Sequence, residues 1–214
     1  MEIETLYEDA QLAVCLKPPV VLSENGGMPE LLQTQLGGEF FCVHRLDKPT
    51  GGVMVYARTR EAAAALSTAF AEGRTKKQYL AAAQGVPGEE KGSFHDLLYH
   101  DAARGKSYVV RRPRRGVKEA VLDYELLGTE EYEEQTLSLL RIALHTGRSH
   151  QIRVQLASRG MPLVGDGRYG SALRLGPIAL WSASLSFPHP STGETMRFDA
   201  PPPDAFPWEL FRFT

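Results

Sequence analysis

The sequence predicts an α+β fold with a mostly antiparallel mixed sheet and a few helices. Short apolar runs recur along the whole chain and far outnumber the segments with helical character. Hydrophobic residues make up 43% and charged residues 23%, and 20 Gly with 14 Pro indicate a folded protein rich in turns. No internal repeat or low-complexity linker divides the 214 residues. We therefore expect one domain over residues 1–214.

The expected strands are short runs of apolar residues. Residues 12–16 and 52–57 are apolar almost throughout, which is typical of strands buried on both faces. Residues 121–127 and 136–144 form a predicted hairpin around an acidic connection at residues 128–135. The other expected strands are residues 79–84, 108–110, 179–187 and 196–198.

Two segments carry helix signals. Thr59 can cap a helix that runs through Ala71 and ends at Gly73. Residues 149–159 have apolar positions one helical turn apart and are followed by Gly160, which favours a helix that ends there.

The cysteines and the N-terminus bear on the compartment. Cys15 and Cys42 are too few for a disulfide framework or a four-thiolate zinc site, so we expect reduced thiols. The N-terminal residues are acidic where a signal peptide is basic, and no apolar run approaches the ~20 residues of a membrane span. These features predict a cytoplasmic protein with no membrane association.

The net charge of −2 hides large local fields. Residues 104–118 hold seven basic residues and no acid, whereas residues 119–134 hold seven acids and no base. Residues 141–174 hold six arginines against one acid, Asp166. The net charge argues against a protein that coats nucleic acid by bulk charge alone, but binding of a polyanion stays open.

Three familiar signals carry no function here. The pattern G-x-G-x-x-G at residues 165–170 is followed by a segment too short and too broken for a pyrophosphate-binding helix, so we expect a glycine-rich turn. The histidine pairs are five residues apart, and no cysteine cluster completes a metal site. No motif of an esterase, a P-loop nucleotidase or a zinc hydrolase is present.

Two clusters of polar residues remain. The segment H-R-L-D-K-P-T-G-G at residues 44–52 lies between apolar runs, and its proline and glycines would hold Asp47 in a tight turn. A turn stabilised by the Asp47 side chain itself is the plain structural alternative. The segment T-G-R-S-H-Q-I-R at residues 146–153 opens the second expected helix with donors suited to an anion or a carboxylate.

These segments closely resemble the RluA-type family of RNA pseudouridine synthases. The family motif H-R-L-D-x-x-T-S-G stands at residues 44–52, with Gly51 in place of the usual serine. The motif K-K-x-Y stands at residues 76–79, and G-R-x-H-Q-[IL]-R at residues 147–153. Weaker similarity to the family extends over nearly the whole chain. A second departure is Gln155, which stands where many members have histidine. The S4-type RNA-binding domain of some members would have to precede Glu8, so we expect none.

The resemblance implies a pseudouridine synthase-like catalytic domain that isomerises uridine in structured ribosomal or transfer RNA, as a monomer and without a cofactor or metal. Asp47 would be the catalytic aspartate, acting as nucleophile or as base on a ribose proton. Arg153 would be its ion-pair partner, keeping the carboxylate ionised. Tyr79 would stack on the uracil near C5, and a tyrosine that only packs in the core is the structural alternative.

The RNA contacts expected from the resemblance follow from the need to extrude the target uridine. Arg45 would fill the gap left in the RNA, and Lys77, Arg148 and His150 of the other motifs would also contact RNA. The basic stretch would follow phosphates through Arg111, Arg112, Arg114 and Arg115, with a solvated loop as the alternative.

Two other classes of function stay open beside this expectation. A catalytically idle RNA-binding or RNA-chaperone relative is disfavoured because Asp47, Tyr79 and Arg153 are all present. A carbohydrate-active enzyme would need a second catalytic carboxylate, and the three motifs contain no other acid.

Overall fold

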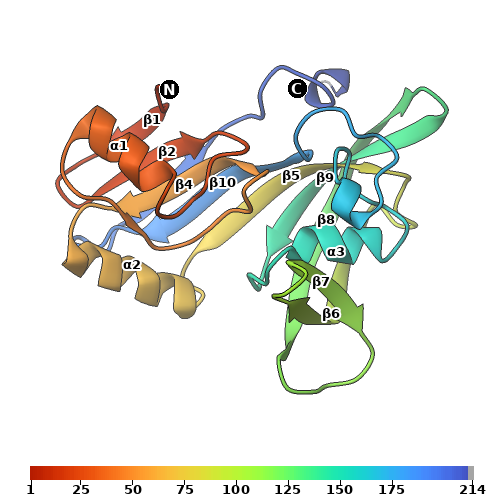
Figure 1. Ribbon diagram of the computed structural model, residues 1–214, viewed down its shortest axis with the longest axis horizontal. Coiled ribbons are helices and arrows are strands. Elements are labelled where there is room, and N and C mark those ends of the chain that lie inside the picture. Colours follow the sequence, from red (N-terminus) through yellow and green to blue (C-terminus); the bar gives the residue numbers. More distant parts are fainter. Residues whose placement is uncertain (212–214) are drawn as a thin grey trace. The chain divides into compact units, whose positions relative to one another are not determined.

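The computed structural model describes residues 1–211 and divides into two compact units (Figure 1). The first unit holds Met1–Gln78 and Trp181–Pro202, and the second holds Tyr79–Leu180 and the chain from Pro203 on. The chain passes from one unit to the other within β5 (Lys76–Gln84), at the start of β10 (Leu180–Pro188) and after Pro202. No helix in residues 1–211 is long and apolar enough to cross a membrane.

The first unit is a mixed sheet with two helices. Its strands follow the order β1-β2-β4-β10, in which only the β4–β10 pair is parallel, and β3 and β11 add to β4 and β10. Helix α2 packs on β3 and β4, and its Leu66 joins a core formed with Val53, Val55 and Phe187. The elements are β1 (Thr5–Glu8), β2 (Leu12–Lys17), α1 (Met28–Leu36), β3 (Phe41–Cys42), β4 (Gly51–Ala57), α2 (Arg60–Ala71) and β11 (Thr195–Asp199).

The strands of the second unit follow the order β5-β9-β8-β6-β7, and the β9–β8, β8–β6 and β6–β7 pairs are antiparallel. Helix α3 packs against β6, β7 and the short helix η1, with Val154 in contact with Leu98 and Ala120. The elements are β6 (Lys91–Asp101), β7 (Lys106–Val110), β8 (Val117–Tyr132), β9 (Gln135–Leu144), α3 (Gln151–Ala157), η1 (Gly167–Tyr169) and η2 (Trp208–Leu210).

The predicted fold class is confirmed, because mixed β-structure dominates and three α-helices accompany it. All eight expected strands lie within observed strands, apart from terminal residue Ala179. The helix expected after Thr59 is also confirmed, since the Thr59 hydroxyl accepts a hydrogen bond from the backbone N–H of Ala62 at 3.1 Å.

The expected bounds of the hairpin connection and of the second helix are wrong. The acidic connection at residues 128–135 is a two-residue turn, because β8 continues to Tyr132 and β9 begins at Gln135. Glu130 and Glu131 are exposed on the paired strand β8, and Glu133 and Glu134 form the turn, so the acidic charge does not end the ladder early. The second helix covers Gln151–Ala157 instead of residues 149–159, and it cannot begin earlier because His150 has a left-handed φ of 56° that a helix does not contain.

Candidate functional site

The expected site residues are divided between the two units. Arg45, Asp47 and Lys77 lie in the first unit. The second unit holds Tyr79, Arg148, His150, Arg153 and the basic residues Arg111, Arg112, Arg114 and Arg115. The ion pair of Asp47 with Arg153 stays a prediction.

The Asp47 turn is bonded along its length to the segment at residues 18–24. The backbone N–H of Val20 donates to the Lys48 carbonyl at 2.8 Å, and the Ser23 hydroxyl bonds both the N–H and the carbonyl of Leu46 at 3.1 and 2.9 Å. The N–H of Thr50 closes the turn on the Asp47 carbonyl at 2.9 Å. The half-buried Asp47 therefore sits on a fixed backbone.

Gly51 and Gly52, which follow this turn, lie against β10. A Cβ atom at Gly51 would come within 2.5 Å of the Trp181 ring. The Trp181 ring therefore leaves no room for the serine that is usual in the family, which explains the glycine at this position. Gly52 has a φ of 117°, and a Cβ there would collide with the backbone of Ser182. The two glycines let β4 run close to β10 immediately after the Asp47 turn.

Lys17, at the end of β2, is a buried cation beneath the Asp47 turn. Its ammonium donates to the carbonyls of Pro18, Val21 and Lys48 at 2.9, 2.7 and 3.1 Å. Burial lowers the pKa of Lys17 to about 8, and the charge of Asp47 opposes that shift. The sequence reasoning missed Lys17, although a lysine that ends an apolar strand and precedes two prolines was a visible signal.

We expect Lys17→Met to change how stability depends on pH. Folding lowers the pKa of Lys17 from 10.5 to about 8, so the folded state disfavours the ammonium. The free-energy cost of burying the ammonium is fully present below pH 8 and decreases between pH 8 and about 10.5. In that pH range the unfolded chain binds more protons than the folded chain, so the free energy of unfolding rises with pH. From pH 7 to pH 10 the unfolding free energy of the wild type should therefore rise relative to Lys17→Met, by on the order of 2 kcal/mol. Urea unfolding of both proteins at the two pH values measures this, and equal changes would contradict it.

Arg45 and Lys77 flank His44 in the first unit. Arg45 is exposed and pairs with Glu24 at 3.0 Å, at an open cavity of about 670 Å³ that is also lined by Phe40, Phe41, Cys42, Val43 and Asn25. The His44 ring stacks on Phe70, with 4.5 Å between the ring centroids. Burial lowers the pKa of His44 to about 3, and the positive charge of Lys77 is a second, smaller cause of that shift. His44 is therefore neutral near pH 7, and its Nε2 accepts a hydrogen bond from the backbone N–H of Val55 on β4 at 3.2 Å.

Arg153, on α3, is buried in a side-on ion pair with Asp166. Its Nε lies 2.7 Å from Asp166 Oδ2 and its Nη2 2.9 Å from Oδ1. The Arg153 and Asp166 side chains are only 5% and 1% exposed, so the pair is fixed and shielded from solvent. The sequence reasoning counted Asp166 as a lone acid within the third charge block and missed this partnership.

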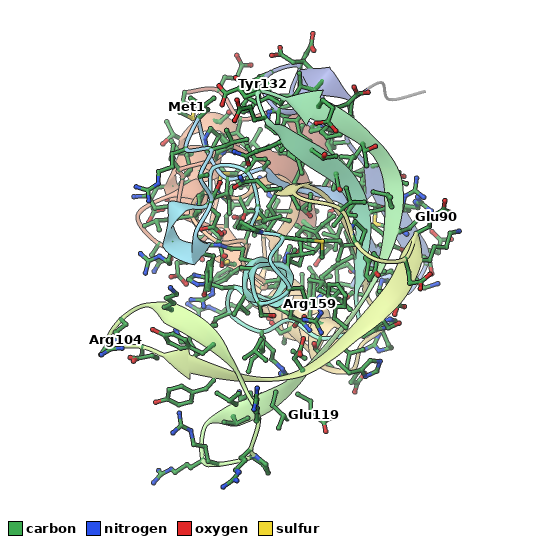
Figure 2. All side chains as sticks on the ribbon, turned by 90° about the vertical axis from the view of Figure 1, so that its right-hand side faces the viewer. Met1, Glu90, Arg104, Glu119, Tyr132 and Arg159 are labelled. Carbon is green, nitrogen blue, oxygen red and sulfur yellow. The ribbon has the colours of Figure 1, made fainter. Side chains whose placement is uncertain are left out.

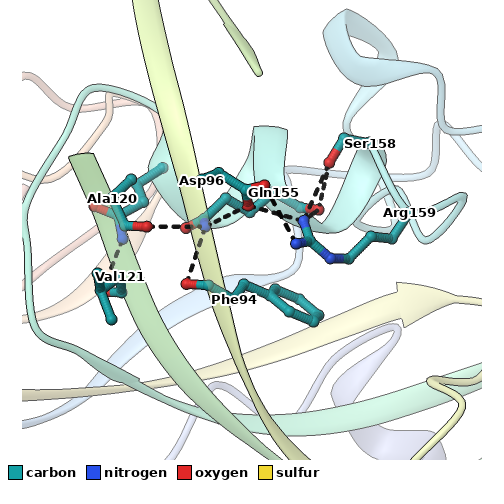
Figure 3. Close-up of polar contacts among 8 residues, drawn as sticks. Phe94, Asp96, Ala120, Val121, Gln155, Ser158 and Arg159 are labelled. Carbon is teal, nitrogen blue, oxygen red and sulfur yellow. Dashed lines mark hydrogen bonds and ion pairs between the residues drawn. The ribbon is translucent and has the colours of Figure 1, made fainter. Parts of the chain in front are cut away.

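Gln155 anchors the same helix on the strands (Figure 3). Its side-chain amide donates to Asp96 at 2.7 Å and lies 3.4 Å from the carbonyls of Phe94 and Ala120. These acceptors come from β6 and β8, so Gln155 fixes α3 across two strands. The departure from the family's histidine thus has a structural role here.

The remaining motif residues of the second unit also have defined surroundings. Tyr79 is buried on β5, with 7% of its surface exposed. Arg148 is held by a hydrogen bond from its Nε to the Glu119 carbonyl at 2.8 Å. His150 Nδ1 lies 2.9 Å from the hydroxyl of Tyr169.

The basic residues expected to bind RNA lie in the exposed turn between β7 and β8. Arg111, Arg112, Arg114 and Arg115 are all exposed, and the Arg114 guanidinium lies 4.5 Å from the ring centroid of Tyr99. Figure 2 shows this turn projecting beyond the strands, near Glu119, with Arg104 at the tip of the neighbouring β6–β7 hairpin. An exposed surface of guanidinium groups and aromatic rings suits a nucleic-acid backbone and its bases.

Each unit carries groups suited to chemistry by side chains: the first holds a carboxylate on a fixed turn, and the second holds a buried guanidinium fixed by an acid and a buried phenol. A carboxylate can attack carbon or accept a proton, and a fixed guanidinium can keep a carboxylate ionised. Among residues 1–211 no group of three or more His, Cys, Asp or Glu side chains is arranged to hold a metal ion.

Comparison with known proteins identifies the family. The family model described as RNA pseudouridylate synthase matches residues 11–158. The dual-specificity RNA pseudouridine synthase RluA of Escherichia coli is 33% identical, over 92% of this chain and 91% of its own length. The ribosomal large subunit pseudouridine synthase D of Pseudomonas aeruginosa is 32% identical, over 98% of this chain and 71% of its own.

A solved structure supports the fold independently. The human RNA pseudouridylate synthase domain containing 1 superposes with a TM-score of 0.83 at 24% identity, over 95% of this chain and 85% of that chain. The pseudouridine synthase-like fold expected from the sequence is thereby confirmed. Because the family model and the relatives span most of the chain, this protein belongs to the RNA pseudouridylate synthase family and is an isomerase that acts on RNA.

Proposed function

We propose that the chain converts uridine to pseudouridine in a stem-loop of ribosomal or transfer RNA, with Asp47 as the catalytic carboxylate. The observation that carries this proposal is the bonding of the Asp47 turn to residues 18–24, which holds one carboxylate on a rigid support. One relative is named for the ribosomal large subunit, and another, the tRNA pseudouridine synthase C of Haemophilus influenzae, is named for transfer RNA. Both classes of RNA are therefore proposed as substrates.

The reaction is an internal rearrangement of one nucleotide. The N1–C1′ bond breaks, the uracil turns, and a C5–C1′ bond forms. The proton on C5 leaves and N1 gains a proton, so no electrons and no external group are transferred. Asp47 acts on the ribose as nucleophile at C1′ or as the base that takes a ribose proton, and both roles need its ionised form.

Arg153 and Tyr79 complete the proposed catalytic set. Arg153 pairs with Asp47 and favours the carboxylate over the neutral acid. The Asp166 fork supports this role, because it fixes the guanidinium through Nε and Nη2 and so sets the direction of the remaining N–H groups. Tyr79 stacks on the uracil and stands near C5, and its burial supports contact with an apolar ring.

The proposed RNA contacts lie on exposed and half-buried positions. Arg45 enters the RNA where the uridine leaves the stack, supported by its exposure at the open cavity. Lys77, Arg148 and His150 hold the nucleotides around the target. We propose that the protein works as a monomeric catalytic domain in the cytoplasm, where RNA of both classes is present.

A site-resolved pseudouridine map of cellular RNA, with and without the gene, tests the proposed function. Loss of pseudouridine at one or a few uridines is expected, and restoring the gene should restore those positions. An unchanged map, combined with RNA binding by the purified protein, would favour a catalytically idle RNA-binding protein instead.

RNA affinity should fall steeply with salt, and the β7–β8 turn should account for part of that slope. Replacing Arg111, Arg112, Arg114 and Arg115 by Gln should flatten the log–log slope by roughly 0.7 to 0.9 for each phosphate that the variant no longer neutralises. Titrations at several salt concentrations measure it. The double variant Arg74→Gln, Arg197→Gln removes exposed arginines of the first unit that pair with nearby acids, and serves as the control. An unchanged slope in the quadruple variant would move the RNA footprint to residues 141–174.

A further inference from the structure

The turn at residues 165–170 links two functional parts of the second unit. Asp166 holds the guanidinium of Arg153, as described above. Two residues on, Arg168 Nη1 donates to the carbonyls of Arg104 and Gly105 at 3.0 and 2.9 Å. Those carbonyls lie at the tip of the β6–β7 hairpin. The G-x-G-x-x-G pattern thus builds a turn that contacts both α3 and the hairpin.

Tyr169 lies where these two contacts meet. Its hydroxyl accepts a hydrogen bond from the backbone N–H of Ser107 on β7 at 2.8 Å and lies 2.9 Å from His150 Nδ1. The centroid of its ring is 5.1 Å from the Arg153 guanidinium and 5.2 Å from the ammonium of Lys106. One phenol therefore touches the hairpin through its hydroxyl and Arg153 through its ring.

Ser107 makes a second connection between the hairpin and α3. This buried residue donates its hydroxyl proton to the Ser149 carbonyl at 2.6 Å, and His100 Nδ1 lies 3.1 Å from the same oxygen. Ser149 immediately precedes His150, the residue that caps α3. A shift of β7 cannot leave the start of α3 unchanged without breaking one of these bonds.

We propose that Tyr169 is a positioning residue that couples RNA binding at the β7–β8 turn to the orientation of Arg153. The Asp166 fork fixes the guanidinium in its plane, and the Tyr169 ring supports its face, so together they define its orientation. β7 carries Ser107 near one end and leads at the other into the arginines of the β7–β8 turn. RNA that binds these arginines would shift β7. Through Tyr169, that shift would bring the Arg153 guanidinium into the orientation that the reaction needs. The inference rests on the proposed catalytic role of Arg153.

The variant Tyr169→Phe isolates the hydroxyl, because it keeps the ring against Arg153. The single-turnover rate at saturating RNA should fall about tenfold, while RNA affinity changes by about twofold or less. Tyr7→Phe is the matched control, since it removes a phenol hydroxyl that donates to Asp9 at 2.9 Å in the first unit. Its rate should equal that of the wild type.

A double-mutant cycle separates coupling from a merely structural role. In the wild-type background, replacing the four arginines at residues 111–115 by Gln should lower the rate at saturating RNA. In the Tyr169→Phe background the same change should lower affinity but not the rate any further, so the effects on the rate are non-additive. Ser107→Ala, which breaks the bond to Ser149, should also lower the rate and should couple with Tyr169→Phe.

The outcomes distinguish the coupling from the proposed function itself. A wild-type rate in Tyr169→Phe, or additive effects on the rate, would overturn the coupling while leaving an active pseudouridine synthase. Absence of pseudouridine formation by the wild type on any RNA would instead reject the proposed function. A lower melting temperature of Tyr169→Phe with a full rate at saturating RNA would show a purely structural residue, and this also rejects the coupling.

Discussion

Asp47→Asn should abolish pseudouridine formation while leaving the fold and RNA affinity nearly intact. The amide has the size of the carboxylate, but it can neither attack C1′ nor accept a proton from the ribose. The turn is held by backbone bonds at Val20 and Thr50 and by the Ser23 hydroxyl on Leu46, so it should survive the change. Release of tritium from RNA labelled at uridine C5 measures the reaction, because the C5 proton leaves in its last step.

The control for this experiment is Asp199→Asn, which removes an exposed carboxylate that pairs with Arg197 on β11. Its tritium release should match the wild type. If Asp47→Asn released tritium at the wild-type rate, Asp47 would lose its catalytic assignment. If its RNA affinity fell steeply, Asp47 would be a structural or binding group.

Much of the fold was predictable because its strands have strong local patterns. Residues 52–57 are apolar without interruption, and this run is β4, fully buried at the centre of the first unit's sheet. Strand β6 escaped prediction because its eleven residues, KGSFHDLLYHD, mix polar and apolar positions. Only Phe94 and Leu98 in that strand are buried. The long-range pairing of β6 with β8 that fixes it has no local signal.

Helix α1 escaped prediction for a related reason. It begins at Met28 after two glycines and contains Pro29 in its first turn, a region that resembles a loop in local sequence. Glu30 accepts hydrogen bonds from the backbone N–H groups of Gly26 and Gly27 at 2.9 and 3.1 Å. That capping arrangement becomes visible only once the backbone is folded.

The candidate site was predictable where a motif named its residues and unpredictable where a partner lay far along the chain. The three motifs indicated Asp47, Tyr79 and Arg153, and their catalytic roles stay predictions. Asp166 stands 13 residues beyond Arg153 in a pattern that suggested only a turn. Lys17 stands 31 residues before Lys48, whose carbonyl it binds. Both are buried charges that act through a group distant in sequence, and such pairing is decided by tertiary packing.

Arg153→Lys should separate a catalytic ion pair from a phosphate clamp, since both fit an arginine in the first turn of α3. Lysine keeps the charge but cannot reproduce the fork to Asp166 through Nε and Nη2. If Arg153 orients Asp47, the single-turnover rate at saturating RNA should fall well over tenfold, with RNA affinity little changed. If Arg153 is a phosphate clamp, Arg153→Lys should keep a nearly full rate, and the contribution of this residue to RNA affinity should decrease as the salt concentration rises.

The burial of Arg153 favours the ion pair, because a side chain only 5% exposed and already bound to an acid is poorly placed to meet a phosphate in solvent. The matched control is Arg159→Lys. Arg159 lies shortly after α3, and its Nη1 and Nη2 donate to Oδ2 and Oδ1 of Asp96 at 2.9 and 3.3 Å. Arg159→Lys loses a comparable fork, so it should lower thermal stability while keeping the rate at saturating RNA. A full rate in Arg153→Lys would remove Arg153 from the catalytic set. Equal losses of rate in both variants would show that weakening the attachment of α3, and not the orientation of one guanidinium, limits the reaction.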